Sequence, residues 1–209
     1  ITSGGHGYCG IGRQRLLNIL QARAAALGVK QVFEAEIADD ADPRLAGADL
    51  IVEAVFEDPK VKADVTAKVE AVTDCVYATN TSTLPITGLA AASKRPEQFI
   101  GIHFFSPVDK MNLVEIIRGK KTGDRAVAKA LDCVRQIRKT PIVVNDARFF
   151  YANRCIIPYI NEGIRMVAEG VEPALVENAA KLVGMPLGPL QLVDETSIDL
   201  GVKIAKATK

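Results

Sequence analysis

The residues best suited to chemistry are His103 and Glu115, which lie in neighbouring apolar segments. Imidazole exchanges a proton near neutral pH more readily than any other side chain, so histidine is the commonest general base in enzymes. A carboxylate beside the ring would hold one tautomer and stabilise the imidazolium that forms after proton abstraction. The pair therefore predicts proton-transfer chemistry. The alternative is a hydrogen-bonded core histidine with a charge on an edge strand, and spacing alone does not separate the two.

Both residues fall within predicted strands. His103 ends the apolar run 99–104, where the end of a strand leaves side chains open to a cleft. Glu115 interrupts the run 113–117, and a buried carboxylate without a partner is costly. We therefore expect the two strands to bring the side chains together.

Strand and helix patterns alternate along the first two thirds of the chain, which predicts a Rossmann-like, doubly wound parallel α/β sheet. After residue 145 the strand patterns stop, and helical patterns predict a second, all-helical domain in residues 146–209. The expected strands are 29–35, 48–55, 76–78, 99–104, 113–117 and 141–144, and the expected helices are 13–27, 60–72, 85–92, 124–137, 150–169, 173–182 and 189–205.

Several motifs in this order resemble the 3-hydroxyacyl-CoA dehydrogenase family. They are Asn-Thr-Ser-Thr-Leu-Pro-Ile at 80–86, Gly-Ile-His-Phe-Phe-Ser-Pro at 101–107, Met-Asn-Leu-Val-Glu-Ile at 111–116, Asn153-Arg154, and Gly-Met-Pro-Leu-Gly-Pro at 184–189. The resemblance extends from about Ala48 to the C-terminus. It implies NAD-dependent oxidation of an L-3-hydroxyacyl-CoA to a 3-oxoacyl-CoA in fatty-acid β-oxidation. It also implies that residues 1–145 form the NAD-binding domain and that the helical domain, shorter here than is usual in the family, contributes to substrate binding and dimerisation.

The resemblance assigns roles to particular residues. His103 would be the base and Glu115 its orienting partner, while Ser82 and Asn153 would hold the substrate's 3-oxygen. The residues expected to contact the cofactor are Glu57, Lys62, Asn80 and Ser106. Two positions depart from the family: Ser106 stands where asparagine is common, and Asp146-Ala-Arg-Phe-Phe replaces the usual Asp-x-Pro-Gly-Phe. Arg148 and Arg154 could meet the CoA phosphates, or serve as structural contacts.

The N-terminal segment fits this scheme less well. Gly5, Gly7 and Gly10 form a Gly-x-Gly-x-x-Gly pattern before a predicted helix, which could bind a pyrophosphate. However, too few residues precede Gly5 for a first strand, and Glu34 lies further on than the ribose-binding acid of such loops. Residues 1–40 instead resemble an internal segment of flavin-dependent aromatic-acyl-CoA hydroxylases. We therefore expect a fusion or shortened gene with its junction near residues 40–49.

Composition agrees with a cytoplasmic enzyme. The net charge is +1 without a basic stripe, which argues against nucleic acid as a partner, and no apolar run is long enough to span a membrane. The four cysteines and His6 show no zinc spacing, so no metal is expected. Three hypotheses remain: the dehydrogenase, as a homodimer or part of a larger fatty-acid oxidation protein; an impaired fragment that binds acyl-CoA; and a flavin monooxygenase fragment.

Overall fold

The structure, a computed structural model, describes Ala26 and residues 43–196. The chain divides into two units, Ile1–Asp39 and Asp40–Lys209, and all the elements described below belong to the second. The glycine pattern at Gly5, Gly7 and Gly10 lies outside the described residues, as do the expected strand 29–35 and nearly all of the expected helix 13–27.

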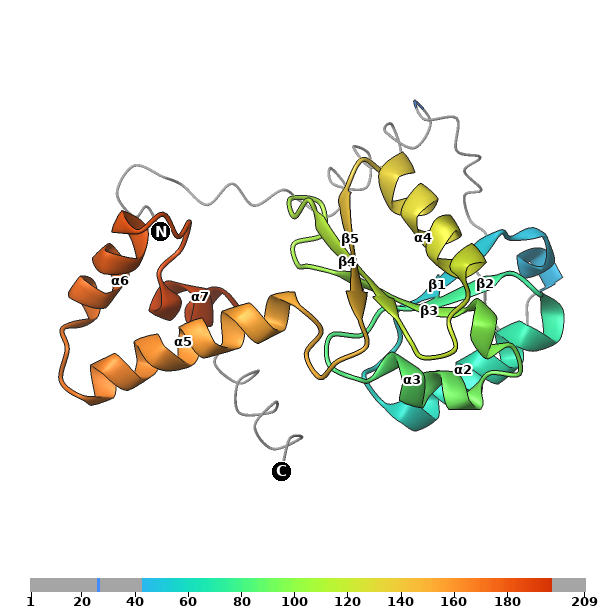
Figure 1. Ribbon diagram of the computed structural model, residues 1–209, viewed down its shortest axis with the longest axis horizontal. Helices are drawn as coiled ribbons and strands as arrows, with labels where there is room; N and C mark the ends of the chain where they lie inside the picture. The colour runs from blue at the N-terminus through green and yellow to red at the C-terminus, as the bar shows by residue number, and fades with distance from the viewer. Residues whose placement is uncertain (1–25, 27–42, 197–209) are drawn as a thin grey trace. The chain divides into compact units, whose positions relative to one another are not determined.

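A five-stranded sheet forms the centre of the α/β part, with its strands in sequence order (Figure 1). The first three strands are parallel to one another, β4 is antiparallel to β3, and β5 is parallel to β4. The strands are β1 (Leu50–Glu53), β2 (Val76–Thr79), β3 (Phe99–Phe104), β4 (Leu113–Arg118) and β5 (Thr140–Asn145).

The predicted doubly wound, mainly parallel sheet is confirmed, with one antiparallel pairing, that of β3 with β4. Residues 105–112 join these strands without a helix. A parallel connection needs a crossover of about a dozen residues or more, usually helical, whereas a short loop returns the chain antiparallel. The direction of β4 follows from the length of this loop.

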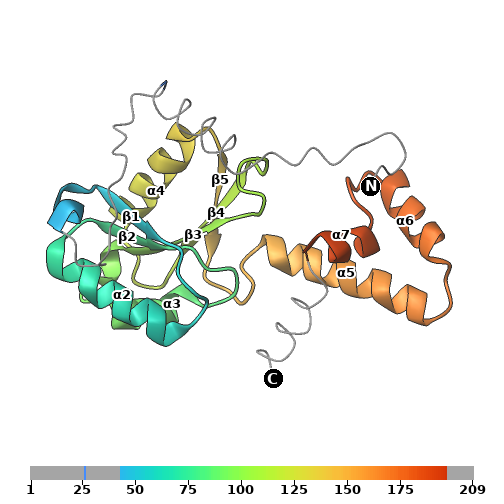
Figure 2. The same ribbon diagram turned by 180° about the vertical axis from the view of Figure 1, so that it is seen from behind.

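Helices cover both faces of the sheet (Figures 1 and 2). One face carries α2 (Pro59–Val72) and α3 (Ile86–Leu89), and the other carries α4 (Asp124–Gln136). Crossovers between parallel strands are right-handed. Because β4 and β5 run opposite to β1–β3 while the strand order continues in the same direction, a right-handed crossover places α4 on the opposite face. Short 3₁₀ segments, η1 (Pro43–Gly47), η2 (Ala90–Ala92) and η3 (Pro96–Gln98), complete this part.

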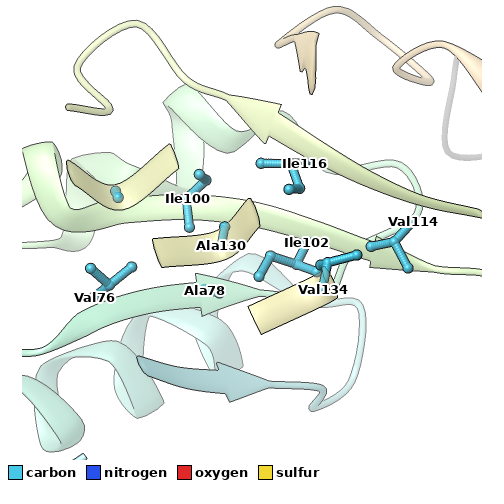
Figure 3. Packing of buried hydrophobic residues seen from close by; sticks show 9 residues of the cluster. Val76, Ala78, Ile100, Ile102, Val114, Ile116, Ala130 and Val134 are labelled. Atoms are coloured by element: carbon cyan, nitrogen blue, oxygen red, sulfur yellow. The ribbon is translucent and has the colours of Figure 1, made fainter. Parts of the chain in front are cut away.

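Alternation along the central strands places one apolar cluster beneath α4 and a second one, together with His103 and Glu115, on the other face. Ile100 and Ile102 of β3 point toward α4, as Figure 3 shows, together with Val114 and Ile116 of β4. Small residues on α4, such as Ala130, let the helix lie close to these branched side chains. Since side chains alternate along a strand, His103 and Glu115 lie on the other face, with α2 and α3.

Three helices follow the sheet. They are α5 (Ala152–Ala168), α6 (Pro173–Leu182) and α7 (Pro189–Thr196). Glu177 of α6 caps the first turn of α7 by accepting hydrogen bonds from Leu190 N at 2.8 Å and Gln191 N at 3.3 Å. The expected bounds of α6 were right at both ends, and the expected extension of the last helix past residue 196 lies outside the described residues. None of the described helices is long and apolar enough to cross a membrane.

Candidate active site

The candidate site lies at one edge of the sheet. The parallel strands β1, β2 and β3 end there with Glu53, Thr79 and Phe104, and the antiparallel strand β4 begins there. The carboxyl edge of parallel strands is where α/β proteins bind ligands, because strand ends and loops leave polar groups exposed there. The predicted site residues at the ends of these strands are therefore brought to one edge.

His103 and Glu115 form a direct pair. They lie opposite each other in the β3–β4 register, and His103 Nδ1 is 2.7 Å from Glu115 Oε2. Both side chains are buried, with relative exposures of 4% for His103 and 0% for Glu115. The proximity predicted from the sequence is confirmed, and a carboxylate on Nδ1 directs the proton of a neutral imidazole to that nitrogen.

The second oxygen of Glu115 binds the start of α5. Oε1 accepts hydrogen bonds from Tyr151 N at 2.9 Å and Ala152 N at 2.8 Å. Burial raises the pKa of Glu115, but the hydrogen bonds from His103, Ala152 and Tyr151 lower it more, so the pKa stays below its ordinary value. The carboxylate therefore stays charged at neutral pH while it satisfies two amide groups that a helix N-terminus leaves without partners.

Two aromatic rings surround the imidazole. The Phe105 ring centre lies 4.4 Å from that of His103, and the Phe150 ring centre lies 6.0 Å away. Among the described residues, no polar group bonds the Nε2 atom of His103. Nε2 is therefore the nitrogen available to accept a proton from a bound molecule.

The segment before α5 has unusual backbone geometry. Phe149 and Phe150 have φ angles of 65° and 51°, in the left-handed region that glycine adopts most easily. Phe149 occupies the glycine position of the Asp-x-Pro-Gly-Phe motif to which the sequence was compared. The Arg148 guanidinium lies 5.3 Å from the centre of the Phe149 ring. The chain therefore adopts the bend without the residue that favours it, immediately before the amides that bind Glu115.

Ser82 and Asn153, for which the sequence predicts a shared role, are in contact. Asn153 Nδ2 donates to the Ser82 carbonyl oxygen at 3.1 Å, which joins α5 to the loop after β2. Asn153 is half-buried and Ser82 is exposed. The Ser82 hydroxyl and Asn153 Oδ1 have no hydrogen-bond partner within the described part of the chain, so both can meet a ligand.

Asn80 has a fixed amide orientation. Its Oδ1 accepts a hydrogen bond from Phe104 N at 3.2 Å, directly after His103 in β3. Its Nδ2 is without a hydrogen-bond partner in the described residues, so this donor is left for a ligand. Asn80 is thus connected through one backbone position to the proposed base.

Glu57 and Lys62 are placed differently from each other. Glu57 Oε1 accepts from Ser82 N and Thr83 N, each at 3.0 Å, and so caps the loop after β2. Lys62 is buried, and its Nζ lies 3.0 Å from Glu53 Oε1 and 3.9 Å from Glu57 Oε2. The sequence did not single out Glu53 as a site residue, although a glutamate ending an apolar strand was a signal for a buried partner.

The other predicted contacts lie at the surface. Ser106, Arg148 and Arg154 are exposed. Among the described residues, Ser106 makes no hydrogen bond with His103. Within the described residues no group of histidine, cysteine or acidic side chains is arranged to hold a metal ion.

Comparisons with known proteins cover most of the chain. The model for "3-hydroxyacyl-CoA dehydrogenase, NAD binding domain" matches residues 17–147, and that for "3-hydroxyacyl-CoA dehydrogenase, C-terminal domain" matches residues 150–209. The first match begins within the segment that was expected to resemble flavin-dependent hydroxylases, and well before Ala48.

Solved structures of 3-hydroxyacyl-CoA dehydrogenases and related enzymes are similar to this chain, in agreement with the family matches. FadB2 of M. tuberculosis is 32% identical with a TM-score of 0.75, over 90% of this chain and 70% of that one. (S)-3-hydroxybutyryl-CoA dehydrogenase PaaH1 from Ralstonia eutropha is 29% identical with a TM-score of 0.77, over 93% and 73%. The 3-hydroxybutyryl-CoA dehydrogenase from Escherichia coli K12 is 29% identical with a TM-score of 0.75, over 91% of this chain but 44% of that longer protein.

Proposed function

Because the chain belongs to the 3-hydroxyacyl-CoA dehydrogenase family, we propose that it oxidises the 3-hydroxyl group of an L-3-hydroxyacyl-CoA, with His103 as the general base. The match to the NAD-binding domain makes NAD its cofactor and the chain an NAD-dependent oxidoreductase of this type. The observation that carries the proposed role is the buried His103–Glu115 pair, with Nδ1 bound and Nε2 left for a ligand.

Glu115 would serve the base in two ways. Its hydrogen bond keeps the proton of the neutral ring on Nδ1, so the lone pair on Nε2 can take the hydroxyl proton. Its negative charge then stabilises the imidazolium, and this interaction is strong because Glu115 is fully buried. General-base assistance of this kind accelerates a reaction roughly a hundred- to ten-thousand-fold.

Ser82 and Asn153 are suited to hold the substrate oxygen. The contact between them fixes the start of α5 against the loop after β2, and α5 begins at the amides that bind Glu115. We propose that the Ser82 hydroxyl donates to the 3-oxygen, since a fixed donor keeps that oxygen within reach of Nε2.

The residues at the carboxyl edge fit the nicotinamide half of NAD. When bound, NAD accepts the hydride that leaves carbon 3 of the substrate. Asn80 offers an oriented amide donor, and this neutral group matches the carboxamide oxygen of the cofactor. The proposed pyrophosphate contacts of Gly5, Gly7 and Gly10 stay a prediction, because these residues lie outside the described part.

The helical segment is proposed to contribute to substrate binding and association. We propose residues 1–145 and 146–209 as the two domains, and a homodimer or a larger fatty-acid oxidation protein as the assembly. Three exposed apolar side chains of α6 and its end, Leu175, Leu182 and Val183, support an association surface there.

The experiment is the oxidation of NADH by acetoacetyl-CoA, followed by the loss of NADH absorbance, with purified wild-type protein and His103→Gln. We expect turnover in the wild type and a decrease of at least about a hundredfold in the variant, with similar thermal unfolding of the two proteins. Equal turnover in both proteins would refute the role of His103. Absence of turnover in a folded wild type would instead favour an acyl-CoA-binding protein without the activity.

A further inference from the structure

The bend formed by residues 146–153 leads from the end of β5 into the first turn of α5. It carries several groups of the site. Two of its amides bind Glu115, and the Asn153 side chain binds the Ser82 carbonyl oxygen. The position of these groups relative to the imidazole therefore depends on the shape of the bend.

Two residues in the middle of the bend hold a backbone conformation that they rarely adopt. The φ angle is 65° at Phe149 and 51° at Phe150. For a residue with a side chain this left-handed conformation is disfavoured by about five- to thirtyfold, whereas glycine adopts it without such a penalty. A backbone of this kind persists only where the surrounding contacts hold it in place. The bend therefore needs anchors.

The carboxylate of Asp146 anchors the first end of the bend. Its Oδ1 accepts a hydrogen bond from Ile86 N at 2.9 Å, and its Oδ2 accepts one from Thr87 N at 2.7 Å. The Asp146 amide donates to the Arg118 carbonyl oxygen of β4 at 3.2 Å. Both carboxylate oxygens are thus bound to the start of α3, which directly follows the loop that carries Ser82.

The bend and the loop after β2 are therefore joined at two places. Asp146 joins them through α3, and the bond of 3.1 Å from Asn153 Nδ2 to the Ser82 carbonyl oxygen joins them at the other end of the bend. Between these joints, Phe150 and Ile86 belong to one buried cluster, with relative exposures of 2% and 0%. The residues with left-handed backbone lie inside this closed arrangement, so loosening either joint lets them relax toward commoner conformations.

We propose that Asp146 is a positioning residue for the proposed catalytic pair: its carboxylate holds the left-handed bend, which delivers two amides to Glu115 and the Asn153 side chain to the loop after β2. This rests on the proposed function, since Glu115 orients the proposed base. Phe149 makes the anchor necessary, because glycine at that position would adopt the bend unaided. The carboxylate acts through the bend, since both of its oxygens are bound by α3.

The test is a double-mutant cycle of Asp146→Asn and Phe149→Gly. Asparagine has the size of aspartate but keeps one acceptor oxygen, so its NH₂ group faces one of the two α3 amides and that bond is lost. Phe149→Gly removes one of the two backbone penalties and leaves the carboxylate in place. The coupling between the two changes separates support of the bend from simple capping of α3.

The matched control is Glu177→Gln. Glu177 is also a carboxylate that accepts from two amides at the start of a helix, Leu190 N at 2.8 Å and Gln191 N at 3.3 Å. For each protein we measure thermal unfolding, the dissociation constant of NADH from its fluorescence, and steady-state oxidation of L-3-hydroxybutyryl-CoA by NAD. Hydrogen exchange of the Tyr151 and Ala152 amides reports on the bend without reference to activity.

We expect Asp146→Asn to lower kcat about tenfold and to speed exchange of the Tyr151 and Ala152 amides about tenfold, with NADH affinity changed less than about twofold. Phe149→Gly alone should keep kcat within about threefold of the wild type, and the double variant should stay within about threefold of Phe149→Gly. Glu177→Gln should lower the unfolding temperature while kcat and the exchange of the two amides stay as in the wild type.

The cycle can contradict the inference in three ways. A folded Asp146→Asn protein with wild-type kcat and exchange would show that the bend needs no carboxylate. An impaired Asp146→Asn protein that Phe149→Gly does not rescue would show that the carboxylate only caps α3. If Asp146→Asn does not fold, the double variant decides: removal of the penalty should restore folding and turnover, and a double variant that stays unfolded would overturn the inference.

The two proposals fail in different ways. If the wild type shows turnover that depends on His103 while Asp146→Asn keeps wild-type kcat and exchange, only the positioning role is wrong. If a folded wild type shows no turnover, the proposed activity fails, and the exchange of the Tyr151 and Ala152 amides across the cycle still decides the role of Asp146.

Discussion

Replacing Glu115 by glutamine tests whether the carboxylate sets the protonation of His103. The side chain of Glu115 has two different neighbours: Oε1 accepts from Tyr151 N and Ala152 N, and Oε2 lies 2.7 Å from His103 Nδ1. The two backbone donors will take the glutamine oxygen. The glutamine NH₂ group must then face Nδ1, which becomes an acceptor, and the ring proton moves to Nε2. The nitrogen that should accept the substrate proton is thereby blocked.

The expected loss of rate follows from the wrong tautomer. An amide in place of the carboxylate beside a catalytic histidine lowers kcat by about 10⁴-fold in serine proteases, and general-base catalysis contributes roughly 10²- to 10⁴-fold. We therefore expect kcat for oxidation of L-3-hydroxybutyryl-CoA by NAD to fall by about a thousandfold, with the affinity for NADH nearly unchanged. Hydrogen bonds to a neutral oxygen are weaker than those to a carboxylate, so the free energy of unfolding should fall by no more than about 2 kcal/mol.

The assay is steady-state formation of NADH from NAD and L-3-hydroxybutyryl-CoA, with thermal unfolding and NADH fluorescence as checks on folding and cofactor binding. His103→Gln is the reference for complete loss of the base. A folded Glu115→Gln protein with kcat within about threefold of the wild type would refute the tautomer argument.

Three further predictions concern pH, backbone and packing. The pKa of Glu115 lies below its ordinary value of 4.5, so the stabilisation by its carboxylate is fully present above pH 4.5 and is lost as the pH falls below that value. In denaturant unfolding, the difference in the free energy of unfolding between wild type and Glu115→Gln should therefore shrink as the pH falls below 4.5. A difference that stays constant down to about pH 3 would contradict this. At Phe149, with φ of 65°, the glycine variant should be more stable than the alanine variant by about 1 kcal/mol, and the reverse order in urea unfolding would contradict the left-handed geometry. Gly101→Ala would place a Cβ 2.6 Å from Ile86 Cδ1, so the free energy of unfolding, measured by thermal unfolding, should fall by about 1–3 kcal/mol. A variant as stable as the wild type would show that α3 shifts without cost.

Much of the sheet could be predicted because its elements are specified locally. The strand 99–104 and the helix 173–182 have the predicted bounds, since apolar runs and prolines mark their ends. The direction of β4 was missed, because it depends on the short connection between two segments that each look like strands. The pairing of His103 with Glu115 could be predicted because both interrupt or end apolar runs that must be buried.

The buried contacts of Lys62 could not be predicted from local pattern. Lysine is abundant on helix surfaces, and Lys68 of the same helix is indeed half-exposed in a pair with Asp64. What distinguishes Lys62 is that its side chain lies under the ends of two strands that are far apart in the sequence. Only the parallel pairing of β1 with β2 brings Glu53 opposite Thr79 and gives the ammonium its partners.

The alternation that builds the core also fixes the register of the proposed catalytic pair. Val114 and Ile116 lie in the cluster beneath α4, and Glu115 between them points to the opposite face, opposite His103. A slip of one residue in β4 would turn Glu115 into that apolar cluster, without His103 and without the amides of α5. The cost of an unpaired carboxylate in an apolar core, several kcal/mol, excludes that register. The folding of β3 against β4 and the assembly of the proposed base therefore depend on the same pattern of residues, so substitutions that weaken one are expected to weaken the other.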